Sequence, residues 1–77
     1  LLNANNLYAQ SSLLESVKRN PKEAASLCQR FRALNANGIS ASSQVALKEV
    51  ATKKNLNKVD AEILSMYVIG LNCPDVN

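Results

Sequence analysis

The two cysteines are the side chains of this sequence with the most definite chemistry. Cys28 falls on the apolar positions of a helical stretch, and Cys73 follows the end of another, just before Pro74. Two cysteines with none left over are typical of a secreted domain with one disulfide. If the two helices pack together, a Cys28–Cys73 bond would close a loop of about 46 residues and contribute roughly 4 kcal/mol. The alternative is two reduced thiols, with Cys28 as a small core residue.

The remaining side chains do not form a recognisable catalytic set. The sequence contains no histidine, which excludes Ser-His and Cys-His nucleophile pairs and histidine-ligated zinc. Asp60 and Glu62 are two positions apart, so on a helix they point to different faces instead of forming an acid–base pair. Two cysteines cannot by themselves complete a Cys₄ zinc site or an iron–sulfur cluster. We therefore expect no catalytic, cofactor-binding or metal-binding residues, and a protein that is not an enzyme.

Residues 46–64 resemble the helix-turn-helix motif of DNA-binding proteins. Ala51 matches the small residue of the first helix, Asn55 the turn, Asn57 the cap of the second helix and Leu64 an inward position. The resemblance implies a second helix lying in the major groove. The motif is short and often matches by chance.

The side chains of that second helix do not suit DNA. It offers one basic residue, Lys58, and residues 58–71 include no Arg, Gln or Asn to read base edges. The overall charge of +3 permits an acidic partner without requiring one. Nucleic-acid binding is therefore the alternative interpretation, and an ordinary corner between two packed helices is the simpler one.

Helical spacing of apolar residues and clear boundary signals divide the chain into four segments. We expect Asn20 to cap the second segment at Pro21 and Gly38 to end it in a left-handed conformation. The core-facing residues of that segment are Ala24, Leu27, Cys28, Phe31 and Leu34. The expected helices are 11–19, 21–36, one that begins among Ser40, Ser42 and Ser43 and ends near Asn55, and 58–71. The sequence thus predicts an all-α fold, a compact bundle of four short helices closed by one disulfide, as a single domain over 11–77.

The last segment is apolar on nearly every face, which is typical of the buried centre of a bundle. So small a bundle has a limited capacity to cover it. Any uncovered remainder would be a surface for a protein partner or for self-association. Ile63, Met66 and Ile69 are the candidate residues for this surface. The alternative is complete burial of the helix.

The first ten residues are rich in asparagine and carry no charge. They fit either a flexible tail or the end of a secretion signal, with Leu1 and Leu2 finishing an apolar core and Ala9 preceding the cleavage point. No apolar run approaches the roughly 20 residues that span a bilayer. We therefore expect no transmembrane segment and an extracytoplasmic location.

Three stretches of the chain are similar to small secreted proteins of unknown function from cyanobacteria. They are residues 60–64 (DAEIL), residues 67–75 (YVIGLNCPD) and Cys28 within residues 26–29 (SLCQ). The resemblance spans about residues 13–76 and implies an export signal, a helical fold and a disulfide, with no known activity. Together these features predict an exported, non-catalytic helical module that binds another protein, with a helix-turn-helix DNA-binding protein as the alternative.

Overall fold

Four helical segments make up most of residues 12–77, the part of the chain that the computed structural model describes. Within these residues there is no strand, so the predicted all-α bundle is confirmed. The segment predicted as a tail or signal remnant, residues 1–10, lies outside the described residues. The helices are 12–19, α2 (Pro21–Ala36), α3 (Gln44–Lys54) and α4 (Lys58–Asn72).

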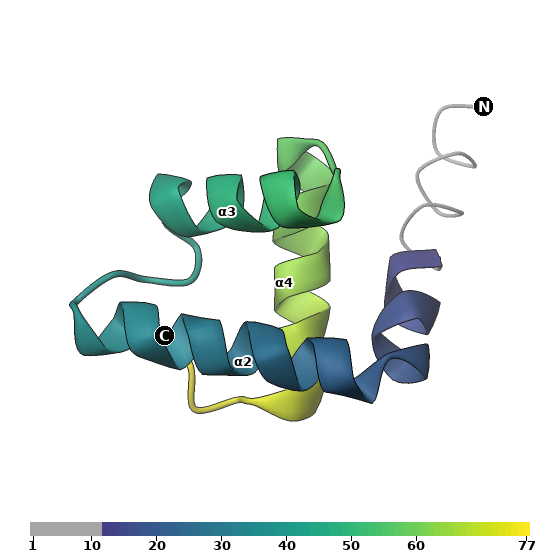
Figure 1. The fold of residues 1–77 in the computed structure, drawn as a ribbon, viewed down its shortest axis with the longest axis horizontal. Coiled ribbons are helices and arrows are strands. Elements are labelled where there is room, and N and C mark those ends of the chain that lie inside the picture. The colour runs from purple at the N-terminus through teal and green to yellow at the C-terminus, as the bar shows by residue number, and fades with distance from the viewer. Residues whose placement is uncertain (1–11) are drawn as a thin grey trace.

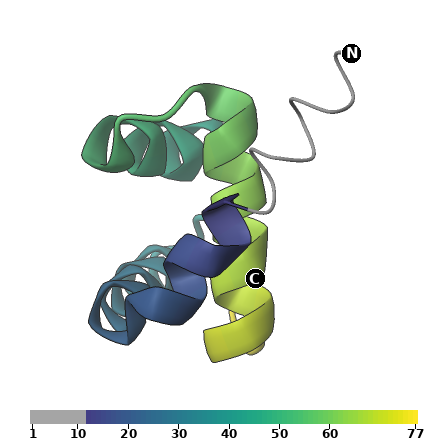
Figure 2. The same cartoon turned by 90° about the vertical axis from the view of Figure 1, so that its right-hand side faces the viewer.

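Helix α4 is the element on which the others assemble. Figures 1 and 2 show α2 and α3 one above the other on the same side of α4, which runs crosswise behind both. The chain reverses direction between α2 and α3, so these two helices are antiparallel (Figure 1). The loop over 37–43 joins them, and the turn over 55–57 leads from α3 into α4. Both α2 and α3 pack against α4, and this arrangement creates one shared core.

Local capping explains where α3 and α4 begin. Of the three serines that could start α3, Ser43 is the one that does so, because its hydroxyl accepts a hydrogen bond from the Ala46 amide at 3.2 Å. Asn57 caps α4 as predicted, accepting a hydrogen bond from the Asp60 amide at 2.8 Å. Each bond satisfies a backbone donor that the first helical turn leaves without a partner.

The turns that end α2 and α3 both use left-handed backbone conformations. Gly38 ends α2 with φ of 76°, as its sequence position predicts. Asn55 ends α3 with φ of 55°, and asparagine is among the few residues other than glycine that tolerate this region. The Leu56 amide then donates to the Ala51 carbonyl at 2.9 Å. The local sequence therefore favours both turns.

Asn20 occupies the predicted boundary but its side chain acts on the other helix. It precedes Pro21 at the start of α2 and forms no side-chain cap there. Instead its Nδ2 donates to the Ser16 carbonyl at 2.8 Å, at the end of helix 12–19. The prediction that the Asn20 side chain caps α2 was therefore wrong. Proline at the first helical position lacks an amide donor, so α2 has less need of a cap.

The core follows the predicted stripe on α2 without exception. Its five buried residues are Ala24, Leu27, Cys28, Phe31 and Leu34. Helix α4, expected to be the buried centre, is central but is covered on one face only. Its buried residues are Ala61, Leu64, Ser65 and Val68. The opposite face of α4 is exposed, because α2 and α3 both lie on the same side of it.

Candidate functional site

Cys28 and Cys73 are joined by a disulfide, as the sequence predicted. Their Cα atoms lie 6.0 Å apart, and the two residues are 2% and 0% exposed. The bond fastens the residue that follows α4 to the middle of α2. Because both sulfurs are buried in the core, the bond is shielded from solvent-borne thiols, which is typical of a structural disulfide and not of a redox-active one.

Two residues further along the chain, Asp75 forms an ion pair with Arg32 of α2. The guanidinium donates through Nε to Oδ2 at 2.8 Å and through Nη2 to Oδ1 at 2.9 Å. This paired geometry is the favourable one for arginine and a carboxylate. The hydrogen bond from Arg32 holds the pKa of the Asp75 carboxyl below its usual value. Both side chains are more than half exposed, so solvent screens the interaction.

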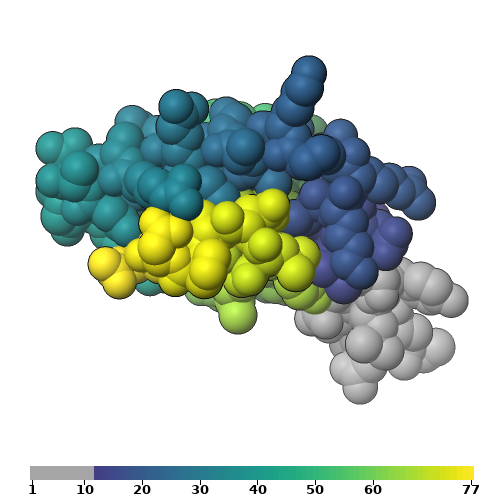
Figure 3. Space-filling view, turned by 90° about the horizontal axis from the view of Figure 1, so that it is seen from below, coloured from purple at the N-terminus to yellow at the C-terminus, as the bar shows by residue number. Residues whose placement is uncertain are grey.

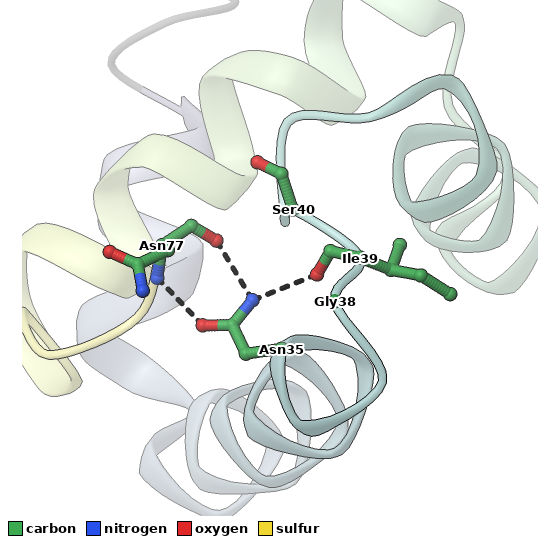
Figure 4. A pocket seen from close by; sticks show the side chains of 5 residues that line it. All are labelled: Asn35, Gly38, Ile39, Ser40 and Asn77. Atoms are coloured by element: carbon green, nitrogen blue, oxygen red, sulfur yellow. Dashed lines mark hydrogen bonds between the residues drawn. The ribbon is translucent and has the colours of Figure 1, made fainter.

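Another two residues on, Asn77 is held by the side chain of Asn35. The Asn35 amide accepts from the Asn77 backbone N–H at 2.7 Å and donates to the Asn77 carbonyl at 3.0 Å and the Ile39 carbonyl at 2.9 Å (Figure 4). The Ala41 amide also donates to the Asn77 carbonyl at 2.8 Å. Asn35 therefore ties the end of α2, the following loop and residue 77 together.

These three attachments share one spacing, and we name residues 73–77 the C-terminal strap. Strap positions 73, 75 and 77 are bound by α2 positions 28, 32 and 35, which follow one face of that helix. Figure 3 shows the last residues of the chain lying along α2 on the lower face of the molecule. Val76, between two of the attachments, is buried in the core. The strap is thus held on α2 by one covalent bond and by polar contacts.

The pocket beside the strap is not a convincing binding site. It has a volume of about 200 Å³ and lies where the loop after α2 meets residue 77 (Figure 4). The side-chain amide of Asn35, which lines it, already bonds to protein groups through both its oxygen and its nitrogen. A ligand would have to displace those bonds, so the pocket is better explained as part of the strap's attachment.

Two further ion pairs connect α2 with α3. Arg30 donates to Glu49 through Nε at 2.9 Å and through Nη2 at 3.2 Å. Lys54 pairs with Glu23. Together with the Arg32–Asp75 pair, these contacts occupy both arginines of α2. The positive charge of α2 is therefore partly neutralised within the chain.

The outer face of α4 departs from a closed core. It consists of positions 59, 63, 66 and 70, which share one side of the helix opposite the buried Leu64. Val59 is 65% exposed and Met66 is 66% exposed. Large apolar side chains that stay in contact with water on one helix face are candidates for binding a partner.

The three residues predicted for a partner surface are placed differently. Met66 lies at the centre of the outer face, while Ile63 and Ile69 are half-buried on its two sides. Ile69 also packs against the core. Val59 and Gly70 were missed as surface residues. The helical repeat could have identified them, since they lie four and seven positions from Ile63.

A family model decides how the chain is to be grouped. The model for a domain of unknown function, DUF8664, matches residues 14–73. The chain belongs to this family. The matched range contains both cysteines of the DUF8664 chain and all of its α4. No curated protein and no solved structure matches it.

Metal-binding clusters and membrane-spanning helices are two further features that a DUF8664 chain could carry. Residues 12–77 hold no cluster of three or more cysteine or acidic side chains that could bind a metal ion. Among the helices that the structure describes, none has the length and apolar content to cross a bilayer.

Proposed function

We propose that this DUF8664 chain is an exported, non-catalytic domain that binds another protein chain through the outer face of α4. The exposure of Met66 and Val59 on a helix whose opposite face is packed into the core supports the binding part. The outer face of α3 is a weaker candidate, because its exposed Val45 lies among Lys48, Glu49 and Lys53. Binding surfaces have few charged residues at their centre, which favours α4.

The Cys28–Cys73 disulfide supports export. Disulfides form and persist in oxidising compartments and are rare in reducing cytosol. The closed loop contributes roughly 4 kcal/mol in the chain-entropy description, a large share of the stability of so small a domain. In a reducing compartment the two cysteines would stay thiols and the fold would lack this contribution. An extracytoplasmic location therefore suits a fold that depends on this bond.

The binding proposal is tested by site-specific photo-crosslinking in cells that produce the protein. A photoreactive residue at position 66 should form a covalent adduct with one discrete protein species. The same residue at position 45, which is also well exposed but lies on α3, is the matched control and should not form it. Equal adducts at the two positions, or none at position 66, would refute the α4 surface.

The export proposal is tested by fractionation combined with thiol alkylation before and after reduction. We expect the protein outside the cytoplasm, with no cysteine alkylated until a reductant is added. Recovery in the cytosol with both thiols alkylated at once would contradict it.

A DNA-binding function is the second candidate, and the corner between α3 and α4 is the observation that favours it. Asn55 turns the chain and Asn57 caps α4, as in a helix-turn-helix. The outer face of α4, however, offers Val59 and Met66 where base-reading side chains are needed. Titration with duplex DNA at low salt tests this function. Affinity that falls steeply with added salt would support it, and no binding would exclude it.

A further inference from the structure

The outer face of α4 has a pattern that is complementary to itself. Its positions 59, 63, 66 and 70 are spaced four, three and four residues apart, so they form one continuous row along the helix. Val59 and Met66 project into solvent, and Ile63 is half-buried beside them. The row ends at Gly70, which has no side chain. The row therefore has a projecting side chain, Val59, at one end and a position without a side chain, Gly70, at the other.

Gly70 has no explanation among residues 12–77, the part of the chain that the structure describes. It lies inside α4, where glycine is less favourable than alanine. A Cβ atom built on Gly70 would meet nothing within 4 Å, so no neighbouring segment requires the missing side chain. Glycine in a helix otherwise permits the close approach of a second backbone or side chain. A group that used this space would come from outside the described residues.

The row is symmetric about the midpoint between Ile63 and Met66. Val59 and Gly70 lie at equal distances on the two sides of that midpoint. In an antiparallel pair of identical helices, Val59 of each copy would meet Gly70 of the other, and Ile63 would meet Met66. A two-fold interface requires this reciprocity, in which each residue contacts the same partner position in both directions.

We propose that the outer face of α4 binds a second copy of this chain in an antiparallel, two-fold homodimer. The proposal rests on the proposed function, because it names the protein partner of that same surface. Val59 fills the space beside Gly70, and Met66 packs against Ile63 across the axis.

The size and charge of the surface set the strength of the dimer. The row covers eleven residue steps, about 17 Å of helix. A contact of one helix face buries less than the roughly 800 Å² per partner of a stable complex, so the dimer is weak and reversible.

The two copies of Glu62 lie about 8 Å apart along the helix axis, on the same side of the interface. Their repulsion, added to the net charge of each chain, opposes association, so salt strengthens the dimer.

The test is analytical ultracentrifugation of the 77-residue chain from about 10 µM to about 1 mM, the range in which so small an interface dissociates. We expect a reversible monomer–dimer equilibrium that shifts towards dimer with added salt. Met66→Lys should raise the dissociation constant at least tenfold, because it places an unpaired charge in the interface. Val45→Lys, the same change on exposed α3, should leave the constant unchanged. Glu62→Gln should lower it.

Gly70→Ala separates dimer contacts from folding. It should raise the melting temperature of the dilute monomer, because alanine favours the helix and nothing obstructs its Cβ. It should also raise the dissociation constant several-fold, since that Cβ occupies the place of the partner's Val59. A variant that stabilises the monomer and dimerises as well as wild type would overturn the geometry.

The other occupants of the face give different outcomes. A wild-type chain that stays monomeric at the highest concentration overturns the homodimer. If removal of residues 1–11 then produces a dimer, those residues cover the face in the intact chain. If position 66 still crosslinks to a different protein in cells, the homodimer fails while the proposed binding function stands.

Discussion

The C-terminal strap and the outer face of α4 are adjacent in sequence, and the chain secures them very differently. The strap is attached to α2 at every second residue, by a disulfide, an ion pair and an asparagine side chain. The outer face of α4 leaves Val59 and Met66 in water. Attachments are thus concentrated where an irregular segment has no helix to hold it. The regular helix can leave a face open because its backbone is already bonded internally.

The disulfide is expected to give the largest effect in this comparison. Replacing both Cys28 and Cys73 by alanine should lower the free energy of unfolding by about 4 kcal/mol, because the unfolded chain regains the freedom of the loop. Urea titration monitored by circular dichroism measures the loss. Wild type treated with reductant and denatured in parallel is the control. An unchanged midpoint would show that the polar attachments alone hold the strap.

A matched pair on α4 compares its two faces directly. Leu64→Ala should lower the free energy of unfolding by about 3 kcal/mol, since it leaves a cavity in the core. Met66→Ala should change it by less than about 0.5 kcal/mol in the dilute protein, because the side chain is exposed. The same urea titration measures both. Similar losses for the two variants would mean that the outer face is covered within the monomer.

Asn35 tests the polar part of the strap. Asn35→Ala should lower the free energy of unfolding by about 1 to 2 kcal/mol, because it removes three hydrogen bonds at a half-buried position. Asn35→Asp is the sharper variant, since it keeps the acceptor for the Asn77 amide and loses the donor to two carbonyls. The melting temperatures of both variants should lie below that of wild type. A melting temperature for Asn35→Asp equal to that of wild type would show that the two hydrogen bonds donated by Asn35 do not stabilise the fold.

Ser65 should give a change of the opposite sign. It is buried on the inner face of α4, and its hydroxyl has no hydrogen-bond partner within residues 12–77. Ser65→Ala should therefore raise the free energy of unfolding by about 1 kcal/mol, because it removes an unpaired polar group and favours the helix. Chemical denaturation checks the sign. A loss of stability would indicate that the hydroxyl has a partner.

The Arg32–Asp75 pair is expected to give the smallest effect, and it depends on pH. Because the pKa of Asp75 is lowered in the folded state, the pair stabilises the fold above the usual aspartate pKa of about 4. That contribution is lost as the pH falls through the lowered folded-state value. Melting temperatures measured from neutral to acidic pH should show this loss, and Asp75→Asn and Arg32→Gln should each remove it. An identical acid response in both variants and wild type would rule the pair out.

The sequence predicted the regular elements well because their signals are local. The stripe from Ala24 to Leu34 repeats at helical spacing, so it identified the buried face of α2 directly. The apolar pattern of α4 was less informative. It is apolar nearly all round, and periodicity cannot say which side the other helices cover. The position of α2 and α3 on one side of α4 decides this, and that is a property of the whole chain.

The strap was only partly predictable for a related reason. Cysteine number and placement predicted the Cys28–Cys73 bond, because the chemistry restricts the choice to one pair. Nothing in the spacing of Asp75 or Asn77 indicated their partners on α2. These contacts join residues more than 40 positions apart, at distances that depend on the finished fold.

The ion pairs between α2 and α3 favour one orientation of α3 along α2 over the reverse. Glu23 near the start of α2 meets Lys54 at the end of α3, and Arg30 meets Glu49 further along. If α3 docked in the opposite orientation, Glu23 would face Glu49 and Arg30 would face Lys54. Like charges would then oppose each other at both points, which disfavours that arrangement. Exposed pairs add little to stability, yet here they discriminate between the correct topology and its reversed alternative.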